Sequence, residues 1–295
     1  ASMLFGRGST GGAVNLVNKV PRLMDENQID MTVGSHNHRR VVGDFNQQTG
    51  ESSALRVSAM KTTADNNGAG SSIDKQGLAG SYRWGIGERD EFTASLYRLE
   101  NNNGINYGMP WIKPTSASPA SATTLLPVSP TSNYGMASDY NNGTATYATL
   151  AHTHRFDGDT ELTTRVRQGS FTRDQRASTI RTSAALNTFG PSTALTRGTQ
   201  NKIQDLDTLY VQSDLSSKFT AWGLKHEVLS GVDVAREQKT VYAARTAAQG
   251  LGGVDLVKPN TTVGTPDDGA WLNEASRSLR VNNQYTATAW GVYAQ

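Results

Sequence analysis

Apolar and polar residues alternate along most of the chain after residue 26, in stretches of about ten residues separated by polar turn residues. Between residues 53 and 63, for example, the apolar Leu55 and Val57 have odd positions, whereas the polar Arg56 and Ser58 have even positions. We call this odd or even position the parity of a residue. A period of two residues places successive side chains on opposite faces of a β-strand, and helical periodicity never takes hold. We therefore predict ten strands, at residues 28–34, 39–47, 53–63, 75–84, 91–100, 144–155, 161–172, 205–218, 226–237 and 279–295.

The connections between these predicted strands are of two kinds, which alternate along the chain. Short ones are expected at 49–52, 85–90, 156–160 and 219–225, long ones at 64–74, 101–143, 173–204 and 238–278, and the short first hairpin at 35–38 is an exception. Short turns on one side and long loops on the other are typical of outer-membrane barrels. A soluble β-sandwich would not need such long loops on one side only. Aromatic residues gather at membrane interfaces, and six stand beside the short turns or near the strand ends on that side: Trp84, Phe92, Phe156, Phe219, Trp222 and Trp290.

The composition narrows the class of protein further. The 295 residues include 28 basic and 26 acidic side chains without a basic stripe, so a nucleic-acid partner is excluded. No apolar run approaches the roughly 18 residues that a membrane helix needs, which excludes a helical membrane protein. The absence of cysteine is compatible with an oxidising compartment. Neither end carries a targeting or terminal signal, and we expect the chain to be a fragment of a longer protein.

Residues 4–21 form a glycine-rich segment ahead of the first predicted strand. Its glycines permit positive φ angles and close approach of the backbone: Gly6, Gly8, Gly11 and Gly12. The spacing Gly-x-Gly-x-x-Gly also matches a dinucleotide-binding fingerprint, which requires a preceding strand and a helix that opens at the third glycine. Here Val14, Leu16 and Val20 lie at even spacing, and Pro21 ends the run. The pattern therefore favours a glycine-rich turn that leads into an extended segment over a nucleotide site.

The sequence Leu-Phe-Gly-Arg-Gly-Ser-Thr-Gly-Gly-Ala-Val-Asn-Leu-Val-Asn-Lys, at residues 4–19, resembles the end of the plug domain in TonB-dependent siderophore receptors of the bacterial outer membrane. The resemblance implies an all-β fold, part of a transmembrane antiparallel β-barrel of about 22 strands whose lumen is filled by the plug. Residues 1–26 would be the C-terminal end of the plug domain, and residues 27–295 the N-terminal part of the barrel, with about ten strands. We expect a tilted meander with neighbours paired in sequence order, and residues 6–19 against its concave face.

Two further stretches narrow the resemblance to the catecholate receptors: Asn-Tyr-Gly-Met-Pro-Trp-Ile at residues 106–112 and Ser-Asp-Tyr-Asn-Asn-Gly at residues 138–143. The resemblance implies an outer-membrane receptor, surrounded by lipid, that binds a ferric siderophore and imports it when TonB remodels the plug. The TonB-binding segment is missing from these residues. No catalysis and no covalently bound cofactor are expected. The alternatives are a passive porin, which would lack the plug tail, and a barrel enzyme, which would carry a nucleophile and a base on its loops.

The connection 101–143 is the expected ligand-binding loop. It contains five prolines, which limit the entropy lost on ordering, and aromatic rings on which catecholate rings can stack: Tyr107, Trp111, Tyr134 and Tyr140. The equivalent loop of related receptors reaches the siderophore pocket, which favours Tyr107 and Trp111. The alternative is that these rings only pack the loop onto the mouth of the barrel.

Four arginines are expected on the lumen-facing side of the strands, where a cationic vestibule would attract an anionic iron complex: Arg56, Arg165, Arg167 and Arg173. Arg173, near the extracellular end, is the expected ligand contact among them. The structural alternative is that each guanidinium pairs with a carboxylate of the plug.

Two histidine pairs have the spacing that places both rings on one face of a strand: His36 with His38, and His152 with His154. A metal site needs further ligands, and no Asp, Glu or Cys completes either pair locally. We therefore expect polar lumen or loop residues here and no metal site. No nucleophile stands beside a plausible base, so no catalytic residue is predicted.

Overall fold

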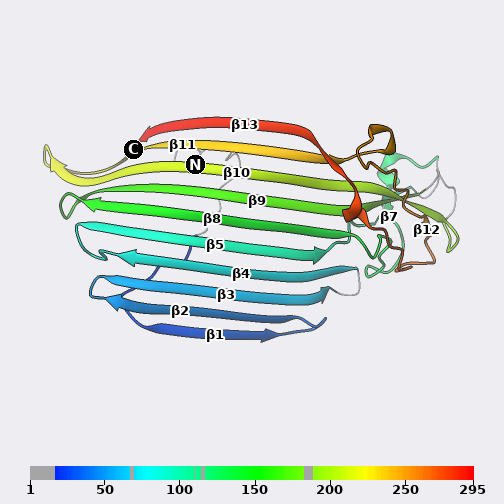
Figure 1. The fold of residues 1–295 in the computed structure, drawn as a ribbon, viewed down its shortest axis with the longest axis horizontal. Helices are drawn as coiled ribbons and strands as arrows, with labels where there is room; N and C mark the ends of the chain where they lie inside the picture. Colours follow the sequence, from blue (N-terminus) through cyan, green and yellow to red (C-terminus); the bar gives the residue numbers. More distant parts are fainter. Residues whose placement is uncertain (1–16, 67–69, 110, 114–116, 183–188) are drawn as a thin grey trace.

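The computed structural model describes residues 17–66, 70–109, 111–113, 117–182 and 189–295, and its main element is one large antiparallel sheet (Figure 1). Neighbouring strands of this sheet follow one another along the chain. The strands are β1 (Glu26–Val33), β2 (Arg39–Gly50), β3 (Ser53–Asn66), β4 (Ser71–Trp84), β5 (Asp90–Gly104), β8 (Tyr140–Arg155), β9 (Thr160–Thr182), β10 (Ala194–Ala221), β11 (Leu224–Ala244) and β13 (Leu279–Ala294).

The remaining elements are short and lie in the connections. Strand β12 (Thr261–Thr262) pairs with β10, and β6 (Trp111–Ile112) pairs with β7 (Thr124–Leu125). Three 3₁₀ turns complete the described part of the chain: η1 (Ala120–Ala122), η2 (Ala247–Gln249) and η3 (Glu274–Ser276). None of the helices among the described residues has the length and apolar character needed to cross a membrane.

The predicted all-β meander is confirmed, and each of the ten predicted strands is present. At the ends joined by short turns, the observed bounds lie within three residues of the predicted ones. Figure 1 shows these turns gathered at the left end of the sheet and the long connections at the right end. The two-residue turn Trp222–Gly223 between β10 and β11 has positive φ angles of 53° and 75°, the conformation that joins two twisted strands with the fewest residues.

At the opposite end the strands are longer than predicted, so two predicted loops are wrong. β9 continues to Thr182 and β10 begins at Ala194, so most of the expected loop 173–204 is a paired hairpin in which Arg173 faces Gln204. β3 and β4 likewise extend into the expected loop 64–74. In these extensions both faces are largely polar, so the alternation disappears from the sequence. The backbone groups still pair, because an unpaired N–H or C=O is costly wherever water is excluded.

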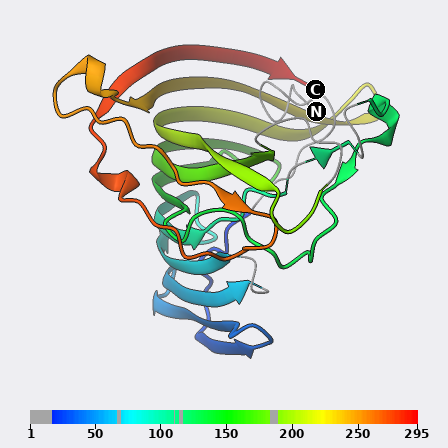
Figure 2. The same cartoon turned by 90° about the vertical axis from the view of Figure 1, so that its right-hand side faces the viewer.

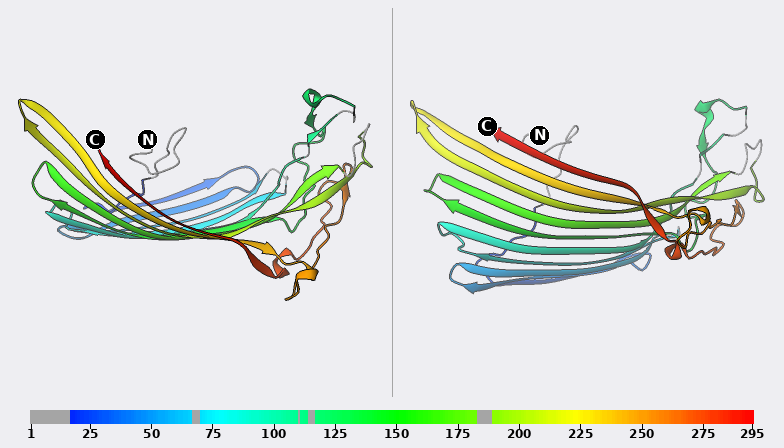
Figure 3. Two further views of the ribbon diagram at one scale, coloured as in Figure 1. Left: turned by 90° about the horizontal axis from the view of Figure 1, so that it is seen from above. Right: turned by 45° about the horizontal axis from the view of Figure 1, so that its top comes forward.

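The sheet is curved, and its two faces have opposite chemical character. Figure 2 shows the strands arranged along an arc from β1 to β13, and Figure 3 shows their ends bending towards one side. On the concave side Arg56 bonds to the Val20 carbonyl of the N-terminal segment, whereas Leu55 and Val57 project to the convex side. Leu150 and Val292, also on the convex side, are 61% and 70% exposed. Large exposed apolar side chains on one face are what a lipid-facing barrel wall requires.

A row of aromatic rings runs along the convex side beside the short turns. Trp84 stacks on Phe92 with 5.3 Å between ring centroids, Phe92 stacks on His152 at 4.4 Å, and His154 meets Phe156 edge-on at 4.7 Å. Amphipathic rings collect where hydrocarbon meets the headgroups. The row therefore marks the border of the apolar band at the short-turn end.

The hydrophobic cluster of the described residues lies in the long connections rather than in the wall. It consists of Ile112, Leu126, Tyr134, Ile180 and Leu195. Ile180 and Leu195 belong to the extended ends of β9 and β10, and the other three belong to the 105–139 connection. This cluster packs the longest connection onto the end of the sheet.

Candidate functional site

The N-terminal segment 17–25 is bound to the concave face by a buried ionic group. Arg56 of β3 donates two hydrogen bonds to the Asp44 carboxylate of β2, from Nε at 2.8 Å and from Nη2 at 2.7 Å. Lys19 Nζ lies 2.5 Å from the same carboxylate, and Ser58 Oγ donates to it at 2.8 Å. Arg56 Nη1 also donates to the Val20 carbonyl at 3.3 Å. A carboxylate that accepts from three side chains, one of them a bidentate guanidinium, is a fully paired buried charge, which fixes the segment in position.

A second set of bonds continues this attachment along the segment. The Asn46 side chain receives the Arg22 N–H at 2.9 Å and donates to the Arg22 carbonyl at 2.9 Å. Arg83 Nη1 donates to the Pro21 carbonyl at 3.3 Å while its Nε bonds to Glu91 at 2.6 Å. The expected position of residues 6–19 against the concave face is therefore observed for 17–19, and residues 6–16 lie outside the described residues.

Beyond the segment, the concave face carries two stacked tyrosines and an arginine. Tyr97 of β5 and Tyr147 of β8 are register neighbours whose ring centroids are 4.7 Å apart at 17°. The Arg167 guanidinium carbon of β9 lies 4.8 Å from the Tyr147 ring centroid, and its Nε donates to Thr149 at 2.9 Å. Asn18 reaches the Tyr147 hydroxyl at 3.3 Å. A flat ring with a cation over its face presents aromatic area and positive charge together.

Further towards the long connections, the same face forms a shallow polar pocket of about 220 Å³. Its lining includes Asn101 and Asn103 of β5, Asn141 of β8 and Arg173 of β9, which all have concave-side parity. Arg173 bonds to Gln175, and among the described residues it forms no ion pair. Amide groups beside an arginine that lacks a carboxylate partner can accept an anionic, hydrogen-bonding ligand.

Of the four aromatic residues predicted to bind the ligand, the three with described side chains lie in different surroundings. Tyr107 lies in the 105–139 connection and is 41% exposed. Tyr134 is only 2% exposed, packs in the hydrophobic cluster and donates its hydroxyl to the Val263 carbonyl at 2.8 Å. Trp111 pairs through its backbone with Leu125, and its side chain lies outside what the structure describes. Tyr140 is the first residue of β8 and donates to Asp174 at 3.2 Å, on the convex side of the strand register.

Two buried cations join the long connections, and the first of them bonds to the backbone of Tyr134. The Arg197 side chain of β10 donates to the Tyr134 carbonyl at 2.7 Å, the Pro259 carbonyl at 3.2 Å and Asp268 Oδ1 at 2.8 Å. Burial alone would raise the pKa of the Asp268 carboxyl, but hydrogen bonds from Arg197 and a backbone N–H lower this pKa below its ordinary value. Tyr134 therefore fits the alternative in which a loop ring only packs the loop onto the mouth of the barrel.

Lys258 is the second of these cations. Its Nζ lies 2.9 Å from Ser178 Oγ, 3.0 Å from the Ala177 carbonyl and 3.4 Å from Asp139 Oδ1. Glu274 Oε1 is 3.7 Å away. Lys258 and Glu274 belong to the 245–278 connection, Asp139 to the 105–139 connection and Ser178 to β9, so one ammonium group holds three parts of the chain together.

The four predicted lumen arginines have different partners. Arg56 pairs with Asp44 and Arg165 lies 3.3 Å from Asp214, so their carboxylates come from the wall and not, among the described residues, from the plug. Arg167 stacks on Tyr147, and Arg173 lines the asparagine pocket. In this geometry, only Arg167 and Arg173 of these four arginines are available to a ligand.

Sequence reasoning missed Tyr97 and Tyr147. Both lie in predicted strands at lumen-facing parity, but they meet only because β5 and β8 pair with Tyr97 opposite Tyr147. The prediction instead selected the aromatic residues of the 101–143 connection. Aligning the predicted strands by register would have paired the two rings.

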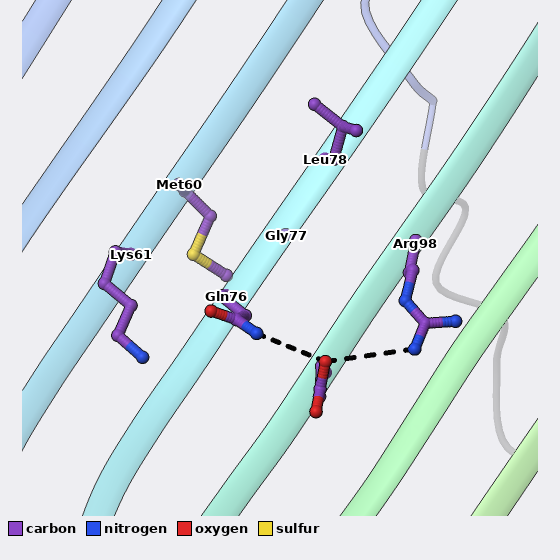
Figure 4. Close-up of a pocket in the computed structure, with 7 residues that line it drawn as sticks. Met60, Lys61, Gln76, Gly77, Leu78 and Arg98 are labelled. Carbon is purple, nitrogen blue, oxygen red and sulfur yellow. Dashed lines mark hydrogen bonds and ion pairs between the residues drawn. The ribbon is translucent and has the colours of Figure 1, made fainter.

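Another shallow pocket, of about 340 Å³, is lined by residues of β3, β4 and β5 (Figure 4). Lys61, Gln76 and Arg98, which line it, have convex-side parity. Its charges are already compensated, since Gln76 and Arg98 both contact Glu100 and Lys61 bonds to Asp74. A ligand in the lumen could not reach it.

One of the two histidine pairs differs from expectation. His36 and His38 lie at the β1–β2 hairpin, as a loop position predicts. His152 and His154 face the convex side rather than the lumen, and Asp90 of β5 lies beside both rings. The carboxylate that the local sequence lacks is thus supplied across the strand pair.

No protein-family model matches the chain. Sequence comparison does find relatives, and their names agree with the resemblance to siderophore receptors. The chain is 26% identical over 274 residues to the catecholate siderophore receptor Fiu of Escherichia coli, covering 88% of this chain and 35% of the relative. It is 28% identical over 113 residues to the probable TonB-dependent siderophore receptor PiuA of Acinetobacter baumannii, covering 38% and 15%. The chain therefore spans about a third of the length of the first of these relatives.

Solved structures of the same two proteins share the fold. The siderophore receptor PiuA of Acinetobacter baumannii superposes with a TM-score of 0.85 at 20% identity, over 100% of this chain and 43% of that structure. The open form of the ferric-catecholate import receptor Fiu gives 0.83 at 21% identity, over 100% and 45%. The predicted similarity to TonB-dependent siderophore receptors, the barrel fold and the outer-membrane location are thereby confirmed.

Proposed function

We propose that this chain is part of an outer-membrane receptor that binds a ferric siderophore, of the catecholate type, and imports it without catalysing a reaction. The observation that carries the proposal is the concave surface made of Tyr97, Tyr147, Arg167, Arg173 and the asparagine pocket. It combines flat aromatic area, positive charge and amide groups on the lumen side of the wall. A tris-catecholate iron complex is anionic and aromatic, so it matches each of these properties.

The arrangement of the N-terminal segment supports a gated pathway over an open pore. Residues 17–25 occupy the concave side and are held there by Arg56, Arg83 and Asn46. We propose that residues 1–26 are the end of a plug domain, and that residues 27–295 are the N-terminal part of the barrel around it. TonB, acting through a segment outside these residues, and the lipid of the outer membrane are the further partners. No covalently bound cofactor is needed for this function.

The catecholate assignment deepens the proposal and rests on two points. The relative with the longest match among those described above is named a catecholate siderophore receptor. The paired tyrosines and the exposed Tyr107 supply the ring surfaces that a catecholate uses and a hydroxamate does not. We include Trp111 among the proposed contacts with Tyr107, because the two stand in the same connection.

Binding by the purified complete receptor tests the function. Quenching of tryptophan fluorescence should be measured while a ferric catecholate or a ferric hydroxamate is added. We expect saturable binding of the catecholate that is tighter by about tenfold or more, a difference of about 1.4 kcal/mol. Equal affinity would reject the catecholate assignment only. No binding of any ferric siderophore by a folded receptor would reject the function and return the porin as the better account.

A further inference from the structure

Three potential metal ligands converge at the short-turn end of the convex face, away from the concave surface. His152 Nε2 lies 2.9 Å from Asp90 Oδ1, and His154 Nδ1 lies 2.6 Å from the same oxygen. One ligand atom from each of the three side chains lies within 4.8 Å of the other two. Among the described residues no other group of three His, Cys, Asp or Glu side chains meets this condition.

The strand register creates this cluster. His152 and His154 are two residues apart in β8, so both rings project from the same face. Asp90, the first residue of β5, is paired directly with His154. The carboxylate is 62 positions from His152 in the chain, which is why the sequence alone shows only the histidine pair.

The two imidazole rings are already oriented by their neighbours. The His152 ring is stacked on Phe92 at 4.4 Å and 9°, and the His154 ring meets Phe156 edge-on at 4.7 Å and 76°. The two imidazoles are 6.3 Å apart at 62° to one another. Rings that packing holds in place lose little further freedom when they bind a ligand, so less of the binding free energy is lost to ordering.

The cluster is also accessible. The side chains of Asp90, His152 and His154 are 46%, 40% and 23% exposed. They stand in the aromatic row at the membrane border, where headgroups and water are present. An ion could therefore enter from the aqueous side and keep at least one position for a solvent ligand.

We propose that Asp90, His152 and His154 form a binding site for Zn²⁺. Two imidazole nitrogens and one carboxylate oxygen are a ligand set that Zn²⁺ accepts, with bonds of about 2.0–2.2 Å and a fourth position left open. To bind the ion at these lengths, Asp90 Oδ1, which lies 2.9 Å from the His152 nitrogen and 2.6 Å from the His154 nitrogen, would move outwards to about 3.4 Å from each. The charge also fits, because one carboxylate offsets half of the charge of a divalent cation. The site stands on its own geometry and does not depend on the proposed transport function.

Zinc binding by the complete receptor in detergent, freed of metal with a chelator, tests the site. We expect equilibrium dialysis to find one Zn²⁺ per chain in the native receptor. We expect Asp90→Asn, His152→Gln and His154→Gln each to weaken binding by about tenfold or more, since losing even an outer-shell partner has that effect. Co²⁺ in place of Zn²⁺ should give visible absorption bands of a four-coordinate site, which each substitution should remove.

The matched control is the double variant His36→Gln/His38→Gln, which removes a pair of the same spacing that has no such carboxylate partner among the described residues. It should bind Zn²⁺ as the native receptor does. Circular dichroism establishes that each variant keeps its β-structure, and Asp90→Asn keeps the shape of the side chain. Absence of zinc binding in the native receptor, or binding that the three substitutions leave unchanged, would overturn the proposal.

Discussion

The wall of the sheet and its long connections both bury charged side chains, but they do so for different purposes. In the wall, Arg56 and Asp44 lie on adjacent strands and face the lumen, so their pair attaches the segment 17–25 to a surface that the strand pairing has already built. In the connections, Arg197 and Lys258 join segments that, among the described residues, strand pairing links only through the two-residue strand β12 on β10. Buried charge therefore fastens a separate segment in one region and builds the fold itself in the other.

The difference predicts which region depends more on a single side chain. Strand hydrogen bonds keep the wall intact when one ion pair is lost, because each strand is paired along its length. The connections have a small hydrophobic cluster and a few backbone contacts, such as Ala137 N–H to the Ala270 carbonyl at 2.8 Å. Removing a buried cation there leaves several acceptors unpaired at once.

The largest expected effect is that of Arg197→Met. The substitution removes the Arg197 donor from Asp268 and from the Tyr134 and Pro259 carbonyls, and we expect the two long connections to open more easily by about 3–5 kcal/mol. Hydrogen exchange of residues 117–139 and 245–278 measures this local free energy. Lys218→Met is the control, since Lys218 forms an exposed pair with Glu227 and should cost less than about 1 kcal/mol. Unchanged exchange in the Arg197 variant would show that the cation does not hold the connections.

A smaller effect is expected for Arg56→Met in the wall. Asp44 would keep Lys19 and Ser58 as partners, so we expect the attachment of residues 17–25 to weaken by about 2–3 kcal/mol while the sheet remains intact. Amide exchange should rise in that segment and not in β3. Arg40→Met is a suitable comparison, because Arg40 bonds only to Thr62 and Met60 among the described residues. Rapid exchange throughout β2 and β3 would instead mean that the pair supports the wall.

The ligand surface should respond to single substitutions by less. Tyr147→Leu, Arg167→Gln, Tyr107→Ala and Trp111→Ala should each weaken binding of a ferric catecholate by about 1–3 kcal/mol, the usual range for an aromatic or arginine contact. Titration of the complete receptor provides the affinity. Tyr82→Leu, on the convex face, should leave it unchanged. If only the loop variants lost affinity, the site would lie in the 105–139 connection and not on the wall.

The smallest effect concerns pH. The pKa of Asp268 is lowered in the folded protein because Arg197 and a backbone N–H stabilise its charged form against burial. The folded connections therefore bind this proton less readily than the unfolded chain does. The stabilisation that the Asp268 carboxylate gives the folded connections is complete above about pH 4, near the ordinary pKa of aspartate. It is lost as the pH falls through the lowered pKa.

Hydrogen exchange between pH 7 and pH 3, corrected for intrinsic rates, checks this dependence. The 245–278 connection should become less protected at the acid end. In Asp268→Asn the protection should be lower at pH 7 and should change less with pH. A native profile without any acid-dependent loss would contradict the assignment.

The same comparison explains how much the sequence could predict. The wall follows from a local rule, since the alternation at Leu55, Arg56 and Val57 decides which side chain faces the lumen. The ten strands and their order were therefore predictable. The ends of β9 and β10 were not, because both faces become polar there and the alternation stops.

The sites depend on contacts between distant residues, and the sequence shows these poorly. Tyr97 meets Tyr147, and Asp90 meets His154, only through the register of β5 with β8. Tyr134 looks like a ligand contact in the sequence, because nothing local shows that Arg197 and Val263 will cover it. The odd or even position of a residue along its strand predicts the face on which its side chain lies. Only the strand register and the packing of the loops determine which residues that side chain contacts.

Uptake of radioactive iron tests the central claim most directly. Cells that carry the complete protein as their only receptor for a ferric catecholate should be compared with and without TonB. We predict saturable uptake that requires TonB and that the double variant Arg167→Gln/Tyr147→Leu strongly reduces at equal surface expression. Uptake that continues without TonB and rises linearly with concentration would contradict a gated siderophore receptor and show a passive pore.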